Sequence, residues 1–118
     1  MMKLSEKDLP NETASLREIQ KYVVKMAEAR NFSKDVVRKM LMLTEEIGEL
    51  AKAVREFSGM KFDAKTQRTD LSNELADCLI VLMGVANITE IDLYDAFIAK
   101  EKVNLSRKWN IIKDKEAK

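Results

Sequence analysis

Apolar residues recur every three or four positions along most of the chain, and this spacing predicts helices rather than strands. The first helix is expected from Ser15 to about Arg30. Ser15 followed three residues later by Glu18 is a capping-box pattern, which marks the N-terminus of a helix. The apolar stripe of this helix consists of Leu16, Ile19, Val23, Met26 and Ala27.

A second helix is predicted from about Lys34 to Ser58. Ser33 is a suitable N-cap for it, and Gly59 is a suitable residue just beyond its end. The side of this helix that is expected to face the protein core, its core direction, carries Leu43, Ile47, Leu50 and Val54.

A third helix is predicted from about Asp70 to Ala86 or Asn87, after a polar connection over 59–69. From Cys78 to Ala86 it is apolar almost all round, whereas a helix on the surface of a small monomer shows a polar face. We therefore expect an all-α, four-helix bundle-like fold in which this helix fills the centre or packs against another subunit. A chain this small has difficulty surrounding such a helix, which predicts a homodimer or homotetramer.

A fourth helix is predicted from the turn at 87–90 to about Ile112. Lys100, Asn104 and Arg107 form one stripe on it, and by periodicity alone this stripe is an ordinary solvated face. Lysine and arginine also donate to phosphate oxygens, and asparagine can donate or accept. The stripe would be a phosphate clamp only if it faces a metal site.

The chain has 118 residues, enough for one domain with one core. We expect a polar leader over 1–13, the helical domain over 14–112 and a charged tail over 113–118. With 46% hydrophobic and 35% charged residues, the composition is that of a soluble globular protein. The net charge of +1 predicts no nucleic-acid polymer as a partner.

Three features of the sequence predict a cytoplasmic protein. The lone Cys78 cannot form an internal disulfide, which suits a reducing compartment. The polar start from Met1 to Pro10 predicts no signal peptide, and the apolar run from Cys78 to Ala86 is too short to span a membrane.

Two short carboxylate clusters carry the candidate chemistry: Glu45-Glu46-Ile47-Gly48-Glu49 and Glu74-Leu75-Ala76-Asp77. Each contains two acids three residues apart, which therefore share one face of a helix. The second cluster leads into the apolar run, so its acids are expected to be partly buried. A buried charge must be paired or must hold a metal. Acids from two helices converging in a bundle predict a site for a hard cation such as Mg²⁺, with Mn²⁺ as the alternative.

A surface interpretation competes with this one. Glu45, Glu46 and Glu49 could simply pair with nearby bases, although Glu46 falls on the flank of the core direction. Glu74 suits an acidic first turn that interacts favourably with the helix dipole, but Asp77 fits that role poorly. The two clusters together therefore favour the metal site.

Histidine is absent from the chain. This excludes zinc sites of the His/Cys type, Ser-His-Asp triads and Glu-x-x-His di-iron bundles. Acid–base chemistry must fall to carboxylates, lysine or tyrosine.

The order Glu-Glu-x-x-Glu, about two dozen residues, then Glu-x-x-Asp in an all-helical chain resembles the MazG-like nucleotide pyrophosphohydrolases. This all-α NTP pyrophosphatase group includes dCTP pyrophosphatases and dimeric dUTPases. The similarity runs from roughly Leu16 to Trp109. Arg30-Asn31-Phe32 resembles a turn that precedes the first acidic helix in many members, and the Lys/Asn/Arg stripe is similar to the family's segment after the second acidic helix.

The resemblance implies a MazG-type fold and Mg²⁺-dependent hydrolysis of a nucleoside triphosphate between its α and β phosphates, as in house-cleaning of the nucleotide pool. The metal ligands it implies are Glu46, Glu49, Glu74 and Asp77. The phosphate-binding residues it implies are Lys100, Asn104 and Arg107. Phe32 would lie near the base, but many members carry Trp there, which leaves the base preference open. Either Glu45 or Glu49 could take the proton from the attacking water.

Two other functions stay open. A metal-free helical interaction or regulatory module would use the acids only as solvated surface. A pyrophosphohydrolase of the same fold could act on another phosphorylated metabolite, such as phosphoribosyl-ATP.

Overall fold

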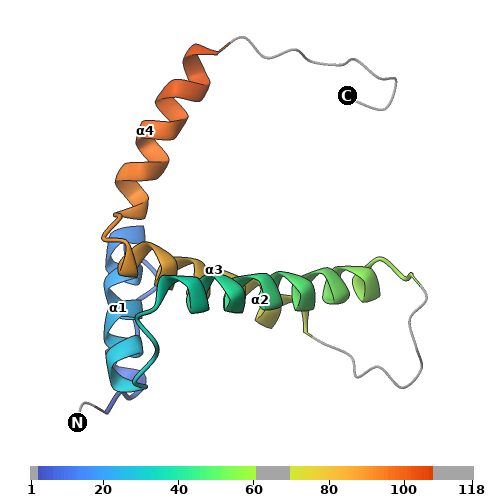
Figure 1. Ribbon diagram of the computed structural model, residues 1–118, viewed down its shortest axis with the longest axis horizontal. Helices are drawn as coiled ribbons and strands as arrows, with labels where there is room; N and C mark the ends of the chain where they lie inside the picture. The colour runs from blue at the N-terminus through green and yellow to red at the C-terminus, as the bar shows by residue number, and fades with distance from the viewer. Residues whose placement is uncertain (1–2, 61–69, 108–118) are drawn as a thin grey trace.

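The structure is a computed structural model that describes residues 3–60 and 70–107. These ranges contain four α-helices, a short 3-10 helix and no strand, so the predicted all-α fold is confirmed (Figure 1). The elements are η1 (Glu6–Asp8), α1 (Leu16–Ala29), α2 (Val36–Phe57), α3 (Leu71–Ile88) and α4 (Leu93–Ser106).

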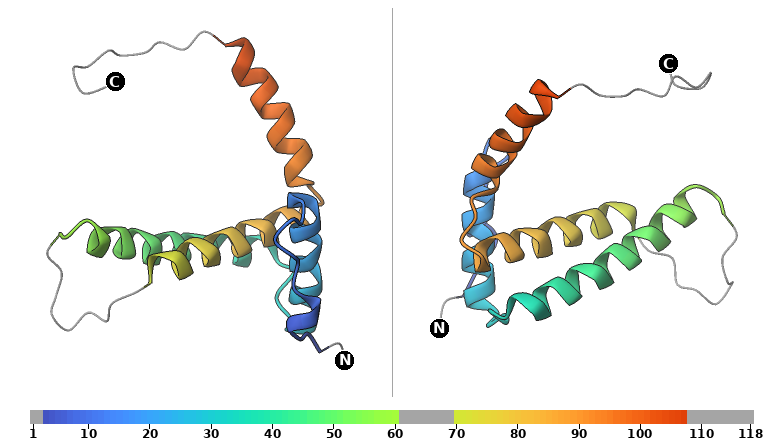
Figure 2. Two further views of the ribbon diagram at one scale, coloured as in Figure 1. Left: turned by 180° about the vertical axis from the view of Figure 1, so that it is seen from behind. Right: turned by 45° about the horizontal axis from the view of Figure 1, so that its top comes forward.

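The helices are arranged as a pair crossed by a third helix, from which the fourth extends. α2 and α3 lie side by side and run in opposite directions, and theirs is the largest contact between helices (Figure 2). α1 crosses one end of this pair and packs mainly on α3. α4 packs chiefly on α1 and points away from α2 and α3 in all three views. The neighbour that would close a bundle around α2 and α3 is therefore not α4 of the same chain.

The helix starts follow from short polar side chains. Ser15 and Glu18 form the predicted capping box of α1. The predicted start of α2 is wrong, because the N-cap is Asp35 and not Ser33. The Asp35 carboxylate accepts from the backbone N–H groups of residues 37 and 38, and its negative charge also interacts favourably with the helix dipole. Ser33 instead accepts a hydrogen bond from the Asp35 N–H.

The helix ends agree less closely with the prediction. Gly59 follows α2 with a φ of 80°, the left-handed conformation that glycine adopts without strain. α4 ends at Ser106 rather than near Ile112, which lies outside the described residues. Arg107 already has an extended backbone, so it cannot continue the helix.

The core is a narrow line between α1, α2 and α3. Its buried apolar residues are Val23, Met26, Leu43, Ala53, Val81, Met83 and Ala86. The predicted core direction of α2 is partly wrong, because Ile47 and Val54 are 51% and 47% exposed. The physical reason is that α2 packs mainly on one neighbour, so only a thin stripe is covered.

By length and composition alone, Leu71–Ile88 has the properties of a helix that crosses a membrane. The core helix of a soluble protein passes the same test, so this property does not place the protein in a membrane. Here α2 covers one side of α3, and Glu74 and Asp77 of α3 face an acid of α2.

One buried amide joins α1 to the turn between α3 and α4. The side chain of Gln20 donates to Asn87 Oδ1 at 2.9 Å and to the Ile91 carbonyl at 2.7 Å. Its own oxygen accepts from the Leu93 N–H at 2.9 Å. Outside this network, Arg17 pairs with carboxylates at the start of α4. The orientation of α4 therefore depends on α1.

Replacing Gln20 by methionine keeps the volume and removes these hydrogen bonds. The half-buried Asn87 amide and the backbone groups of Ile91 and Leu93 lose their donor or acceptor, so we expect the free energy of unfolding to fall by roughly 1–3 kcal/mol. Urea denaturation measures this change. Lys21→Met, one position along on the exposed side of α1, is the matched control and should stay within about 0.5 kcal/mol of the parent. Equal stability of the two variants would contradict the role given to Gln20.

Candidate functional site

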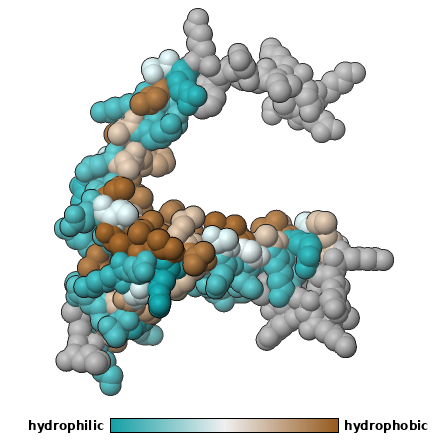
Figure 3. Space-filling view, in the orientation of Figure 1, coloured by the Kyte–Doolittle hydropathy of each residue, from teal (hydrophilic) through white to brown (hydrophobic). Residues whose placement is uncertain are grey.

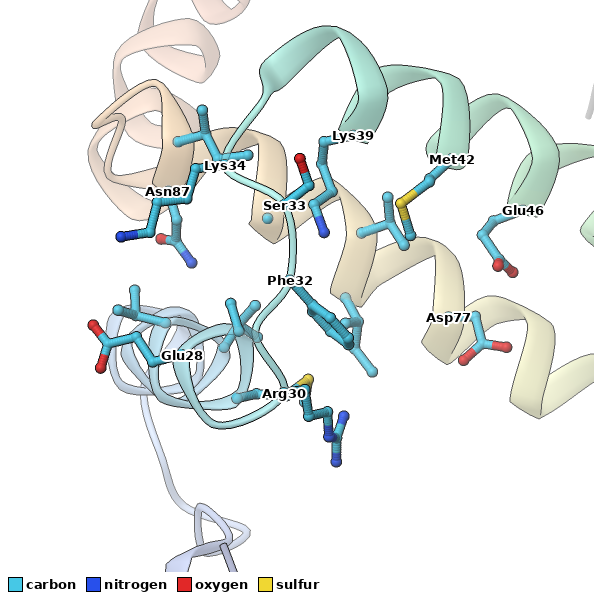
Figure 4. A pocket seen from close by; sticks show the side chains of 18 of the residues that line it. Glu28, Arg30, Phe32, Ser33, Lys34, Lys39, Met42, Glu46, Asp77 and Asn87 are labelled. Carbon is cyan, nitrogen blue, oxygen red and sulfur yellow. The ribbon is translucent and has the colours of Figure 1, made fainter. Parts of the chain in front are cut away.

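Three of the four predicted metal ligands converge between α2 and α3. Glu46 comes from the middle of α2, and Glu74 and Asp77 come from the first two turns of α3. One carboxylate oxygen of each lies within 4.8 Å of those of the other two. Figure 4 shows Glu46 and Asp77 facing each other across the gap between the helices. The antiparallel pairing of α2 and α3 thus brings together acids that lie far apart in the sequence.

The cluster carries uncompensated negative charge. Partial burial raises the pKa of Glu46 above its usual value, and repulsion from Asp77 and Glu74 raises it further. The pKa of the neighbouring Cys78 thiol is also raised, by burial first and then by Glu46. Over the described ranges, no lysine or arginine forms an ion pair with these three acids. An oxygen-only, anionic donor set of this kind fits a hard divalent cation.

Glu49 and Glu45 lie beside this group rather than within it. Both are exposed on α2, and Glu49 is one turn further along the helix than Glu46. Of these two, Glu49 exerts the larger repulsion on Glu46. The metal-ligand role of Glu49 and the general-base roles of Glu45 and Glu49 stay predictions.

A cavity of about 490 Å³ adjoins the acids, with Glu46 and Asp77 at one end. Its other walls are mostly apolar and come from α1 and α3, including Val23, Ala27 and Ile80. This volume is in the range of small-molecule binding sites. The cavity therefore has the size and lining for an organic ligand whose charged end meets the carboxylates.

The turn after α1 places Phe32 on this cavity. Asn31 adopts the left-handed conformation with a φ of 52°, and the Phe32 N–H bonds back to the Ala27 carbonyl at 2.9 Å. This pattern is a Schellman motif, which ends α1 and reverses the chain. Phe32, the residue predicted to lie near the base, consequently lines the cavity (Figure 4).

The sequence analysis missed Lys39, which is 5% exposed and lines the same cavity. Its aliphatic stem lies against Gly84 of α3, where an added Cβ would come within 3.3 Å of the lysine Cδ. Its ammonium lies 4.9 Å from the centre of the Phe32 ring. The available signal was position, because Lys39 precedes the core residue Leu43 by one helical turn.

The basic stripe of α4 lies elsewhere. Lys100 and Arg107 are exposed, and Asn104 is half-buried. Because α4 extends away from α2 and α3, the chain does not bring its own stripe to the acidic cluster (Figures 1 and 2).

Neither the curated proteins nor the solved structures include a match to this chain. A scan of protein families matches residues 35–108 to the MazG nucleotide pyrophosphohydrolase domain. The matched segment is well over half of the chain and contains both acidic clusters. The chain therefore belongs to the MazG nucleotide pyrophosphohydrolase family, whose members are hydrolases acting on acid anhydrides.

Proposed function

We propose that the protein hydrolyses nucleoside or deoxynucleoside triphosphates to the monophosphate and pyrophosphate with Mg²⁺, in house-cleaning of the nucleotide pool. The convergence of Glu46, Glu74 and Asp77 beside a cavity of ligand size is the observation that carries this proposal. These three carboxylates would hold the cation, with Mn²⁺ as an alternative metal. When bound, the cation neutralises phosphate charge and polarises the scissile phosphorus.

For the general base, the geometry favours Glu49 over Glu45. The attacking water must lose a proton to a carboxylate beside the metal site but not necessarily bound to the metal. Glu49 lies one turn from Glu46 and interacts with its charge more strongly than Glu45 does. Its exposure leaves its oxygens accessible to water.

The phosphate-binding stripe would come from a second copy of the chain. Lys100, Asn104 and Arg107 belong to the α4 segment, which extends away from α2 and α3, so they would serve an acidic cluster in another subunit. The uncovered apolar surface supports such an assembly, since apolar residues gather where α1 crosses the pair of α2 and α3 (Figure 3). Along the rest of α2 and α3, further apolar residues are exposed: Ile47, Val54, Phe57, Leu75, Leu79 and Leu82. Exposed patches of this kind mark subunit interfaces, which agrees with a homodimer or homotetramer.

The first test concerns the metal. Because the pKa of Glu46 is raised in the folded protein, the folded state binds its proton more tightly than the unfolded state does. Ionised Glu46 therefore lowers the free energy of unfolding at pH values above its raised pKa in the folded protein. This loss is absent at pH values below the pKa that Glu46 has in the unfolded chain. Without metal, Glu46→Gln should be more stable than the parent at pH 7.5, and the difference should shrink toward pH 4.

Adding Mg²⁺ should reverse this order. At about 100 times its dissociation constant, a cation that binds only the folded state stabilises it by about 2.7 kcal/mol. We expect this gain in the parent and its near loss in Glu46→Gln, as measured by urea denaturation with EDTA or Mg²⁺. Equal stabilisation of both proteins by Mg²⁺ would contradict binding of the cation at this cluster.

The second test separates a base from a ligand. Glu49→Gln should lower kcat by about 10²-fold or more, the usual contribution of a general base, and leave the Mg²⁺ concentration for half-maximal rate nearly unchanged. Glu74→Gln should instead shift that concentration upward. Glu45→Gln is the control on the same helix and should keep most of the rate. A large Mg²⁺ shift in Glu49→Gln would make Glu49 a metal ligand, as the family resemblance implies.

The third test concerns the second subunit. Losing a buried charged contact to phosphate costs roughly 2–5 kcal/mol, so Lys100→Ala should lower kcat/KM by about 30-fold or more. Lys102→Ala is the control. Mixing inactive Glu46→Gln with Lys100→Ala, after unfolding and refolding together, should restore part of the activity because some sites then combine intact residues. No recovery in the mixture would contradict a site shared between subunits.

A further inference from the structure

The cavity has carboxylates at one end and a buried lysine further along its wall. Glu46 and Asp77 mark one end, and Lys39 lies near the start of α2, seven residues before Glu46. At 1.5 Å per residue, this separation is about 10 Å along the helix axis. A group held at the carboxylates through its phosphates would therefore direct a different part of itself toward Lys39.

Over the described residues, the Lys39 side chain has no hydrogen-bond or ion-pair partner. Its ammonium lies over the face of the Phe32 ring. Of the charged residues that line the cavity, it alone is buried. Hydrogen-bond partners stabilise the charge of a largely buried side chain, and the Phe32 ring leaves the N–H groups of Lys39 without a protein acceptor over the described residues, so they are accessible from the cavity. This side chain consequently has donors available to a ligand.

The surrounding residues hold this ammonium at the cavity wall. The absence of a side chain at Gly84 leaves room for the lysine stem, whose Cδ and Cε would lie 3.3 and 3.4 Å from an added Cβ. Phe32 lies on the other side of the ammonium (Figure 4). A purely structural lysine would extend its ammonium to water, as long charged side chains do on surfaces.

We propose that Lys39 determines base specificity by donating to the carbonyl oxygen O4 of a pyrimidine or O6 of a purine, the position at which cytosine and adenine carry an amino group, so that the enzyme prefers keto bases to amino bases. This inference rests on the proposed function, because the nucleotide is oriented by its phosphates at the carboxylates. An ammonium group has three donors and no acceptor. It therefore suits the O4 of uracil or thymine and the O6 of guanine or hypoxanthine, and it opposes the amino group of cytosine or adenine.

The experiment compares substrates that differ in this group and in the protonation of the adjacent ring nitrogen: dUTP against dCTP, and dITP against dATP. The ratio of kcat/KM for the keto member to that for the amino member is measured with Mg²⁺. We expect the parent to prefer the keto member of both pairs. Lys39→Met keeps the packing of the stem and should reduce the ratio by roughly tenfold or more, as expected for one hydrogen bond to a charged group.

Two further variants make the result specific. Lys39→Gln carries an amide that can donate or accept, so its ratio should approach one. Lys34→Met is the matched control, because Lys34 lines the same cavity but is exposed, and it should keep the parent's ratio. Calorimetric binding of the non-hydrolysable α,β-imido analogues of the four nucleotides gives the same comparison without turnover.

The outcomes separate this inference from the proposed function. Keto-selective binding that depends on Lys39, without hydrolysis, would support this inference and overturn the proposed hydrolysis. Hydrolysis without keto preference in the parent would overturn this inference alone. An equal loss of rate for all four substrates in Lys39→Met, with the ratio unchanged, would also overturn it, because Lys39 would then act on the phosphates or on the fold.

Discussion

The contact between α2 and α3 must hold three mutually repelling carboxylates together. Glu46, Glu74 and Asp77 approach within a few ångströms, and partial burial strengthens their repulsion. Apolar packing along the same two helices, through residues such as Leu43 and Val81, opposes this repulsion. The core packing therefore sets the register of the two helices, and this register brings the three acids together. A divalent cation in this position would convert the least favourable part of the contact into a favourable one.

The same narrow packing explains why one chain is incomplete as a catalyst in the proposed mechanism. α2 and α3 cover each other along one stripe only. The direction of α4 is fixed by the contacts that Gln20 and Arg17 make with the start of that helix. Apolar faces of α2 and α3 are thus left uncovered, and α4 extends away from the acidic cluster. In the proposed mechanism, this arrangement keeps the acids apart from the proposed phosphate-binding residues of the same subunit. In the proposed assembly, charge neutralisation is then left to the metal and the neighbouring α4.

Local sequence signals predicted the helices well. Features that depend on how the helices pack against one another could not be predicted from these signals. The capping box at Ser15 and the left-handed Gly59 depend on a few adjacent residues, which the sequence shows directly. The exposure of Ile47 depends instead on how many helices surround α2, which periodicity does not report. For the site, two acids three residues apart on α3 predicted a shared face. The burial of Lys39 required knowing that Gly84 of another helix lies opposite it.

The placement of Lys39 also bears on how a nucleotide would be oriented. A triphosphate is strongly anionic, so an exposed cation of the cavity lining such as Lys34 attracts its phosphates. Lys39 is instead recessed between Phe32 and Gly84, and most of the residues around it in the cavity are apolar. A flat, neutral base can enter such a chamber, whereas a phosphate would lose its hydration there. Burial thus leaves the lysine its hydrogen-bond donors, and the cost of desolvating a phosphate opposes phosphate binding beside it. The phosphates of the ligand would therefore bind at the end of the cavity where the carboxylates can hold a cation.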